Sequence, residues 1–165
     1  MVFRKNKIYE KNGNDDMDDL RKLQEEVAEH LGIDPLPIRF EFLGDEDSRL
    51  YLEDEYVGIN IKYKNDYLEC AKSITHEYRH AFQIFYASLY ETELAKRWRK
   101  LLGSQINSSN MMEDGSDYIN QELEIDAFAF TKFYLKKYKD IDVINKIPGL
   151  DELLDLYIKK NIRMM

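Results

Sequence analysis

The sequence predicts an α+β domain, and three observations lead to this fold class. An amphipathic helical pattern comes first, three short stretches with strand-like alternation follow, and helical periodicity dominates the rest of the chain. The chain of 165 residues has no internal repeat and is long enough to bury a core without disulfides. We therefore expect a single domain over residues 1–165, with an N-terminal helix, a small antiparallel sheet and then further helices.

The first helix is expected after a polar, loose segment that covers residues 1–15. Asp18 and Asp19 can begin this helix, and Gly32 with Pro35 ends it. The apolar residues that recur on one of its faces are Leu20, Leu23, Val27 and Leu31.

Three strands are expected at residues 38–42, 49–53 and 57–61, with a turn between the first two. The third strand leads into the next helix, and no fourth strand of similar strength could cover it. We therefore expect this third strand to be the sheet edge above the cleft, where an extended peptide could add through main-chain hydrogen bonds. Gly58 would permit close approach of the peptide backbone.

The remaining chain is expected to be helical with one long interruption. Asp66 and Glu69 form a capping box for a helix that runs to about Tyr90. Further helices are expected at residues 91–102 and 118–139, and a last one after Pro148 and Gly149. Residues 103–117 read as a long loop, which we expect to form a mobile rim of the cleft.

The expected helix after Asp66 carries the most informative motif, His76-Glu77-Tyr78-Arg79-His80. In this HExxH pattern the two histidines stand one turn apart, so both imidazoles can converge on one metal ion. Glu77 lies beside them and could take a proton from a water molecule and pass it to a leaving amine. The motif therefore predicts a hydrolytic zinc site.

A third ligand has to come from elsewhere in the chain. Cys70 is the sole cysteine and is expected in the core, while His30 is expected at a helix end. The downstream helix carries three acids. Glu122 and Asp126 share one helical face, whereas Glu124 projects about 200° away from Glu122. We expect Glu122 to bind the metal, Asp126 to accept a hydrogen bond from a ligand histidine, and Glu124 to face solvent.

The HEYRH motif, followed about forty residues later by Glu-x-Glu-x-Asp-x-Phe-Ala, resembles the gluzincin metallopeptidases. The minimal single-domain members, including the ImmA/IrrE type, are the most similar. This resemblance implies a minimal zincin fold, a zinc cofactor and a peptide or protein substrate. It implies His76, His80 and Glu122 as metal ligands, Glu77 as general base and Asp126 as support for a ligand. The family form usually has Ala where this chain has Ile125, and a metzincin would need Gly and His where this chain has Gln83 and Tyr86.

The charge and composition of the chain argue against certain classes of binding partner. The net charge of −8 and the pI of about 5.0 argue against nucleic acid, which requires a concentrated basic surface. The basic cluster Lys96, Arg97, Arg99 and Lys100 is expected to be a solvated helix face. The sequence shows no signal-peptide pattern and no apolar run of membrane-spanning length, and we expect a cytoplasmic protein that does not engage a membrane.

Three function classes follow from these features. The leading one is a zinc-dependent peptidase, and the intact Glu77 favours it. The alternative is a zinc-binding regulatory or interaction module of a mobile element, which would bind a partner such as a repressor. A structural component of a phage or plasmid is a third class. Tyr118 and Tyr134 are candidates for stabilising an oxyanion, because both lie near the acids of the second helix.

Overall fold

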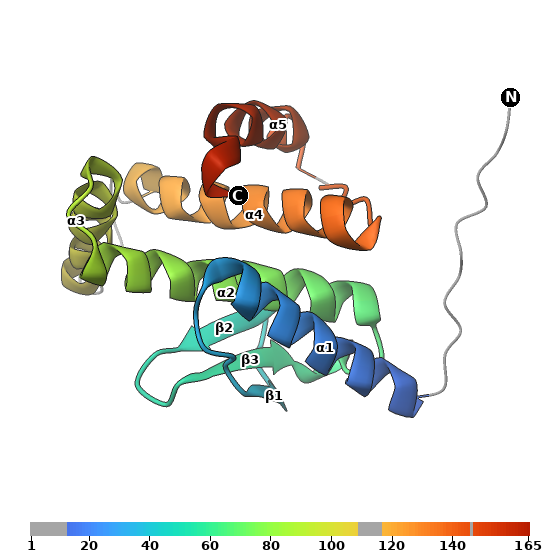
Figure 1. The fold of residues 1–165 in the computed structure, drawn as a ribbon. Helices are drawn as coiled ribbons and strands as arrows, with labels where there is room; N and C mark the ends of the chain where they lie inside the picture. Colours follow the sequence, from blue (N-terminus) through green and yellow to red (C-terminus); the bar gives the residue numbers. More distant parts are fainter. Residues whose placement is uncertain (1–12, 109–116, 146) are drawn as a thin grey trace, which may run out of the picture.

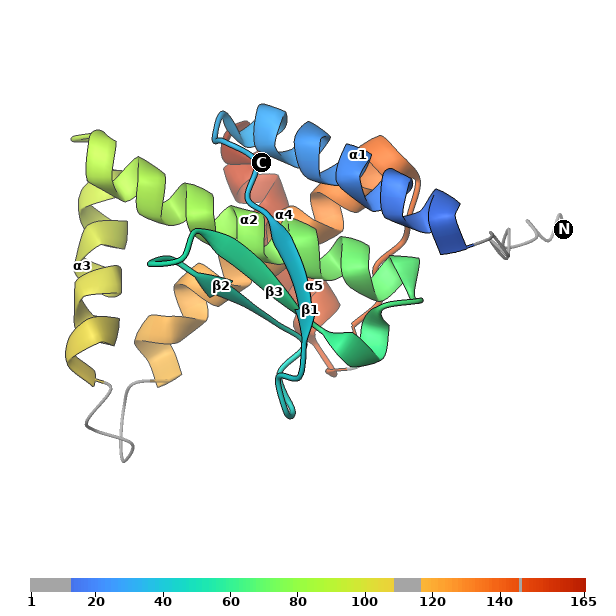
Figure 2. The same cartoon turned by 90° about the horizontal axis from the view of Figure 1, so that it is seen from below.

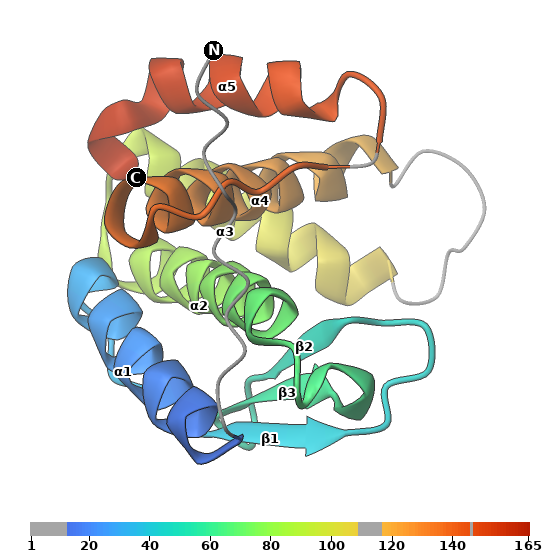
Figure 3. The same cartoon turned by 90° about the vertical axis from the view of Figure 1, so that its right-hand side faces the viewer.

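The computed structural model describes residues 13–108, 117–145 and 147–165; within these ranges, the side chains of residues 13–16, 104–108 and 117–121 are not described. It confirms the α+β class: within the described ranges, an N-terminal helix is followed by a three-stranded sheet and then by four more α-helices (Figure 1). The sheet and α1 lie on one side of α2, α4 lies on the other side, and α5 covers α4 (Figures 1 and 3).

The elements agree with the expected order along the chain. The first half contains α1 (Gly13–Leu31), β1 (Ile38–Glu41), β2 (Ser48–Tyr51), β3 (Tyr56–Asn60) and the 3-10 turn η1 (Ile61–Tyr63). The second half contains α2 (Tyr67–Leu89), α3 (Glu93–Ser108), α4 (Asp117–Lys139), α5 (Leu150–Asn161) and η2 (Ile162–Met164). None of the helices in these described ranges combines the length and apolar character needed to cross a membrane.

The sheet differs from the expected antiparallel one. Its order is β1-β3-β2, with β1 parallel and β2 antiparallel to β3, so the sheet is mixed. The expectation that residues 57–61 form the sheet edge was wrong, because β3 is paired on both sides and every one of its residues is buried. The edge beside α2 is β2 (Figure 2).

Gly58 lies at a crowded position within the sheet. A Cβ atom built on Gly58 would lie 2.1 Å from Glu41 Oε1 and 2.9 Å from the Tyr51 ring. Glycine is therefore required here by neighbours within the sheet, not by an incoming peptide. The edge was misplaced because β3 lies between β1 and β2, an order that its position before the motif helix does not indicate.

Helix α2 begins at the expected N-cap residue, Asp66, but the reciprocal half of the predicted capping box is not formed. The Asp66 side chain accepts a hydrogen bond from the Glu69 backbone N–H at 3.1 Å. The Asp66 N–H donates to the Tyr63 carbonyl at 2.8 Å, and the Glu69 carboxylate pairs with Lys72. Most of α2 then runs through the interior, between the sheet and α4. The main core surrounds it and includes Leu23, Val27, Val57, Ile59, Ile74, Tyr78, Phe130, Leu135 and Leu154.

Helices α1 and α3 are both longer than the sequence predicts. Helix α1 begins at Gly13, inside the segment that was expected to be loose, and residues 1–12 lie outside the described part of the chain. Helix α3 continues to Ser108, so the loop expected at residues 103–117 begins later than predicted. Residues 109–116 lie outside the description, and the mobile rim expected there stays a prediction.

Candidate metal site

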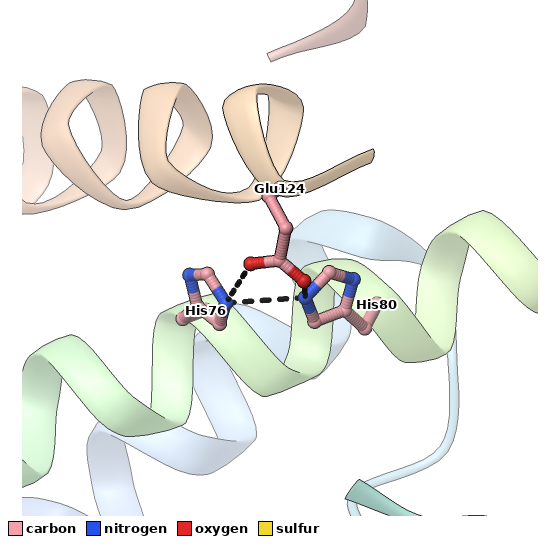
Figure 4. A group of neighbouring side chains, drawn as sticks. All are labelled: His76, His80 and Glu124. Atoms are coloured by element: carbon pink, nitrogen blue, oxygen red, sulfur yellow. Dashed lines mark hydrogen bonds and ion pairs between the residues drawn. The ribbon is translucent and has the colours of Figure 1, made fainter. Parts of the chain in front are cut away.

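Helix α2 presents His76 and His80 one turn apart on the same face, as the motif predicts. Their Nε2 atoms lie 3.1 Å from each other (Figure 4). Both side chains are mostly covered, with exposed fractions of 13% and 18%. The two imidazoles thus point at one common position at the wall of a cleft.

Glu124 on α4 supplies the carboxylate that faces this position (Figure 4). Its Oε2 lies 3.2 Å from His76 Nε2, and its Oε1 lies 3.2 Å from His80 Nε2. The ligand atoms of these three residues all lie within 4.8 Å of one another, and such a group could hold a metal ion. Phe128, one turn further along α4, contacts the His76 ring at a centroid distance of 4.6 Å and marks the same helical face.

The structure corrects the expected placement of the three acids. Glu122 pairs with Arg97 of α3 at 2.6 Å, and Asp126 is buried against Arg79, so neither contacts an imidazole. Glu124 faces the histidines instead of pointing away from them. The helical spacing was correct, but α4 packs against α2, α3 and α5 at once. Acids on several of its faces therefore find partners, and spacing alone does not show which face meets α2.

The geometry of His76, His80 and Glu124 fits a single ion. Ligand atoms about 2.0–2.2 Å from a tetrahedral ion lie roughly 3.3 Å from one another. The two imidazole nitrogens are 3.1 Å apart, and each lies 3.2 Å from a different oxygen of the Glu124 carboxylate. With one oxygen counted for Glu124, the three ligand atoms lie within 4.8 Å of one another. Neutral imidazole nitrogens and a carboxylate offer lone pairs at this position, and a cation would satisfy all three of them.

When no ion is bound, Glu124 and His80 shift each other's pKa values. Burial alone lowers the pKa of His80, but the hydrogen bond and the charge of Glu124 outweigh burial and raise this pKa to about 9. Burial likewise raises the pKa of Glu124, yet the hydrogen bonds from His76 and His80 and their charges lower it well below its usual value. A proton on His80 can thus neutralise the carboxylate when no metal is bound.

Glu77 lies beside the two histidines in the wall of the same cleft, which has a volume of about 340 Å³. It is 6% exposed, and its Oε1 accepts a hydrogen bond from Ser48 Oγ at 2.7 Å. Ser48 is the first residue of the edge strand β2, and Arg49, Leu50 and the nearby Leu52 also line the cleft. No sequence pattern singled out Ser48, since only the pairing order of the sheet brings it to Glu77.

A second polar cluster lies deeper between α2 and α4. Arg79 is fully buried and donates to both carboxylate oxygens of Asp126, through Nε at 2.7 Å and Nη2 at 2.9 Å. Tyr157 of α5 donates to Asp126 Oδ1 at 3.2 Å. Gln83 donates to Asp126 Oδ2 at 2.8 Å, and its own Oε1 lies 2.9 Å from His80 Nδ1. Asp126 was expected to bond a histidine directly, but Gln83 stands between them.

Three other sequence candidates, Cys70, His30 and Tyr134, do not line the cleft. Cys70 is a buried core residue, and burial raises the pKa of its thiol to about 12. His30 Nε2 lies 2.9 Å from the backbone carbonyl of Met165. Tyr134 is buried in the main core and is not part of the cleft wall, and the side chain of Tyr118 lies outside the described part.

The basic cluster of α3 is exposed, as expected, and three of its four residues make local contacts. Arg97 pairs with Glu122, and Lys96 pairs with Glu93 at 3.0 Å. Arg99 donates to the backbone carbonyls of Ala87 and Tyr90, each at 2.9 Å.

Comparison of the chain with protein-family models, with curated proteins and with solved structures finds no match. The function therefore has to be argued from the chemistry of the site.

Proposed function

We propose that this protein is a zinc-dependent peptidase of gluzincin-like type, in which His76, His80 and Glu124 hold the metal. The observation that carries the proposal is the convergence of two imidazoles and one carboxylate on a single position beside Glu77. Three protein ligands with an open fourth position are typical of catalytic zinc, whereas structural zinc sites have four ligands. The cleft in front of the three residues leaves that fourth position accessible.

Zinc is the proposed metal because two imidazoles and a carboxylate form a donor set that it commonly takes. When bound, it would lower the pKa of a coordinated water toward 7 and polarise the carbonyl of a peptide bond.

Glu77 is the proposed general base. Its carboxylate would remove a proton from water as the oxygen attacks the carbonyl carbon, and would return this proton to the nitrogen as the C–N bond breaks. Ser48 holds one carboxylate oxygen of Glu77 by donating a hydrogen bond at 2.7 Å. This contact orients the carboxylate from the side of the sheet, so that Glu77 does not depend on α2 alone for its position.

The substrate is proposed to lie along β2. This strand is the sheet edge that borders the cleft, and Ser48, Leu50 and Leu52 line the cleft wall. An extended peptide can pair with an exposed strand edge through its main chain, which places its amide bonds near Glu77 without a requirement for particular side chains. The proposed peptide-binding edge thus moves from β3, as the sequence suggested, to β2.

The decisive experiment compares Glu77→Gln with the wild type. The glutamine variant should keep its zinc but lose peptide hydrolysis by about two to four orders of magnitude, because an amide cannot accept the proton. Glu69→Gln is the matched control, since Glu69 lies on the same helix and pairs with Lys72 on the surface. The control should retain full activity.

Two results would contradict the peptidase proposal. Equal turnover by the wild type and Glu77→Gln would exclude Glu77 as the base. No turnover by the zinc-loaded wild type on a broad peptide library would favour the alternative, a zinc-binding regulatory module.

A further inference from the structure

Gln83 is a buried side chain that connects the candidate metal site with the deeper Arg79–Asp126 pair. It lies on α2, three residues after His80, and is fully buried. Its side chain contacts His80 at one end and both Leu123 and Asp126 at the other. A buried amide with partners at both ends raises the question of which end faces the histidine.

The contacts of Gln83 determine the orientation of its amide. Its Nε2 lies 2.9 Å from the Leu123 backbone carbonyl and 2.8 Å from Asp126 Oδ2. A carbonyl and an ionised carboxylate only accept hydrogen bonds, so the NH₂ group has to face them. Turning the amide over would place its oxygen against both acceptors. The Oε1 atom of Gln83 is therefore fixed on the side of His80.

The orientation of this amide determines the tautomer of His80. The Oε1 atom can only accept, and it lies 2.9 Å from His80 Nδ1. Nδ1 must then carry the proton, which leaves the lone pair of the neutral ring on Nε2. That nitrogen is the one that faces His76 and Glu124.

Asp126 is itself held in place by groups from two other positions in the fold. Arg79 donates to both of its oxygens, and Tyr157 donates to one of them. Arginine is charged at any pH at which proteins fold, so the carboxylate has a permanent partner. The chain of contacts runs from Arg79 through Asp126 and Gln83 to His80. The other imidazole has no such support among the described residues, because His76 Nδ1 is buried without a hydrogen-bond partner there.

We propose that Gln83 is the positioning residue for His80: it selects the tautomer that offers Nε2 to the metal, while Asp126 and Arg79 fix the orientation of its amide. This role rests on the metal-binding part of the proposed function. It does not require that the protein cleaves peptides. Partners of this kind orient a ligand imidazole and are worth about 10- to 100-fold in metal affinity.

The test compares the zinc affinity of Gln83→Met with that of the wild type, by competition with a chelator. Methionine has a similar length but neither accepts from Nδ1 nor donates to Asp126, so affinity should fall by about 10- to 100-fold. Gln24→Met is the matched control, because Gln24 is a partly buried glutamine of α1 that bonds the Leu36 carbonyl. Its zinc affinity should equal that of the wild type.

A second measurement observes the His80 proton directly in the wild-type protein. Nitrogen-15 NMR of the zinc-loaded wild type should show a proton on Nδ1 of His80 that exchanges slowly with solvent, assigned by its loss in His80→Ala. In Gln83→Met, this proton should exchange much faster. A wild-type protein without a protected Nδ1 proton on His80 would overturn the proposal.

Failure of this proposal can be distinguished from failure of the site itself. Wild-type protein that binds no zinc would overturn both. Equal zinc affinities of Gln83→Met and the wild type would overturn only the role of Gln83 and leave the metal site standing.

Discussion

Helices α2 and α4 meet at two clusters that both pair acidic and basic side chains, yet the two clusters have opposite hydrogen-bonding balance. Around Asp126, the side chains of Arg79, Gln83 and Tyr157 all donate to the carboxylate. Around Glu124, the facing atoms are two imidazole nitrogens, which offer lone pairs when the rings are neutral. The Asp126 cluster is complete as it stands. The Glu124 cluster needs a proton or a cation to be satisfied.

The two clusters also differ in access to solvent. Arg79 and Asp126 have side-chain exposures of 0% and 2%, whereas the side chain of Glu124 is 44% exposed at the cleft. An ion can reach the Glu124 cluster from the cleft, whereas the Asp126 cluster is closed to solvent. Two features therefore distinguish an acid that could bind a metal from an acid in a structural ion pair on the same helix. The first is whether the facing groups donate hydrogen bonds or offer lone pairs, and the second is whether solvent reaches the carboxylate.

The largest expected effect on stability concerns the Asp126 cluster, which is closed to solvent. Arg79→Met should lower the free energy of unfolding by about 3–5 kcal/mol, because it leaves a buried carboxylate without its charge partner. Urea unfolding of metal-free protein measures this loss without any contribution from zinc. The double variant Arg79→Met with Asp126→Leu should lose less than the sum of the two single changes. A loss below 1 kcal/mol for Arg79→Met would show that the pair is not structural.

The next largest effect is expected on zinc affinity, where substitutions of Glu122 and Glu124 on α4 should differ. Glu124→Ala should weaken zinc binding by more than about 100-fold, beyond the range for a residue that merely supports a ligand. Glu122→Ala should change the affinity little, because Glu122 pairs with Arg97 and does not contact the histidines. Isothermal titration with zinc compares the two variants directly. The reverse order would return the ligand role to Glu122.

The contribution of the Glu124 cluster to the stability of the fold should depend on pH when metal is absent. Glu124 raises the pKa of His80 from 6.5 to about 9, so their pairing stabilises the fold fully below pH 6.5 and is lost as the pH rises through about 9. The difference in unfolding free energy between wild type and Glu124→Gln should shrink over that interval. Chemical unfolding at a series of pH values measures this difference. A constant difference from pH 6 to 10 would exclude the pairing.

The smallest effect on stability is expected for the exposed ion pair of Arg97 with Glu122. The Arg97 side chain is 67% exposed, and its pair with Glu122 is screened by solvent. Arg97→Ala should therefore change the free energy of unfolding by less than about 1 kcal/mol. Thermal or urea unfolding provides the measurement, with Arg79→Met as the buried counterpart. A loss as large as that of Arg79→Met would mean that exposure does not separate the two ion pairs.

The sequence predicted the motif helix well because its signals are local. Asp66 caps α2 through a neighbouring residue, and the spacing of His76 and His80 follows from helical geometry. The choice between Glu122 and Glu124 depends on how α4 is rotated against its neighbours. That rotation reflects packing against α2, α3 and α5 together, which no local pattern records.

The contributions of Ser48 and Gln83 were not predictable for the same reason. Ser48 reaches Glu77 because β3 pairs between β1 and β2, an order that alternation alone does not indicate. Gln83 has a role because a buried carboxylate on another helix fixes its amide. In the sequence, Gln83 is notable only as a departure from the metzincin pattern.

A crystal structure of the zinc-loaded protein tests the central claim most directly. It should show one ion about 2.0–2.2 Å from Nε2 of His76, Nε2 of His80 and a carboxylate oxygen of Glu124. An ion bound by Glu122 with Glu124 turned into solvent, or zinc that binds away from the two histidines, would contradict the assignment of this site.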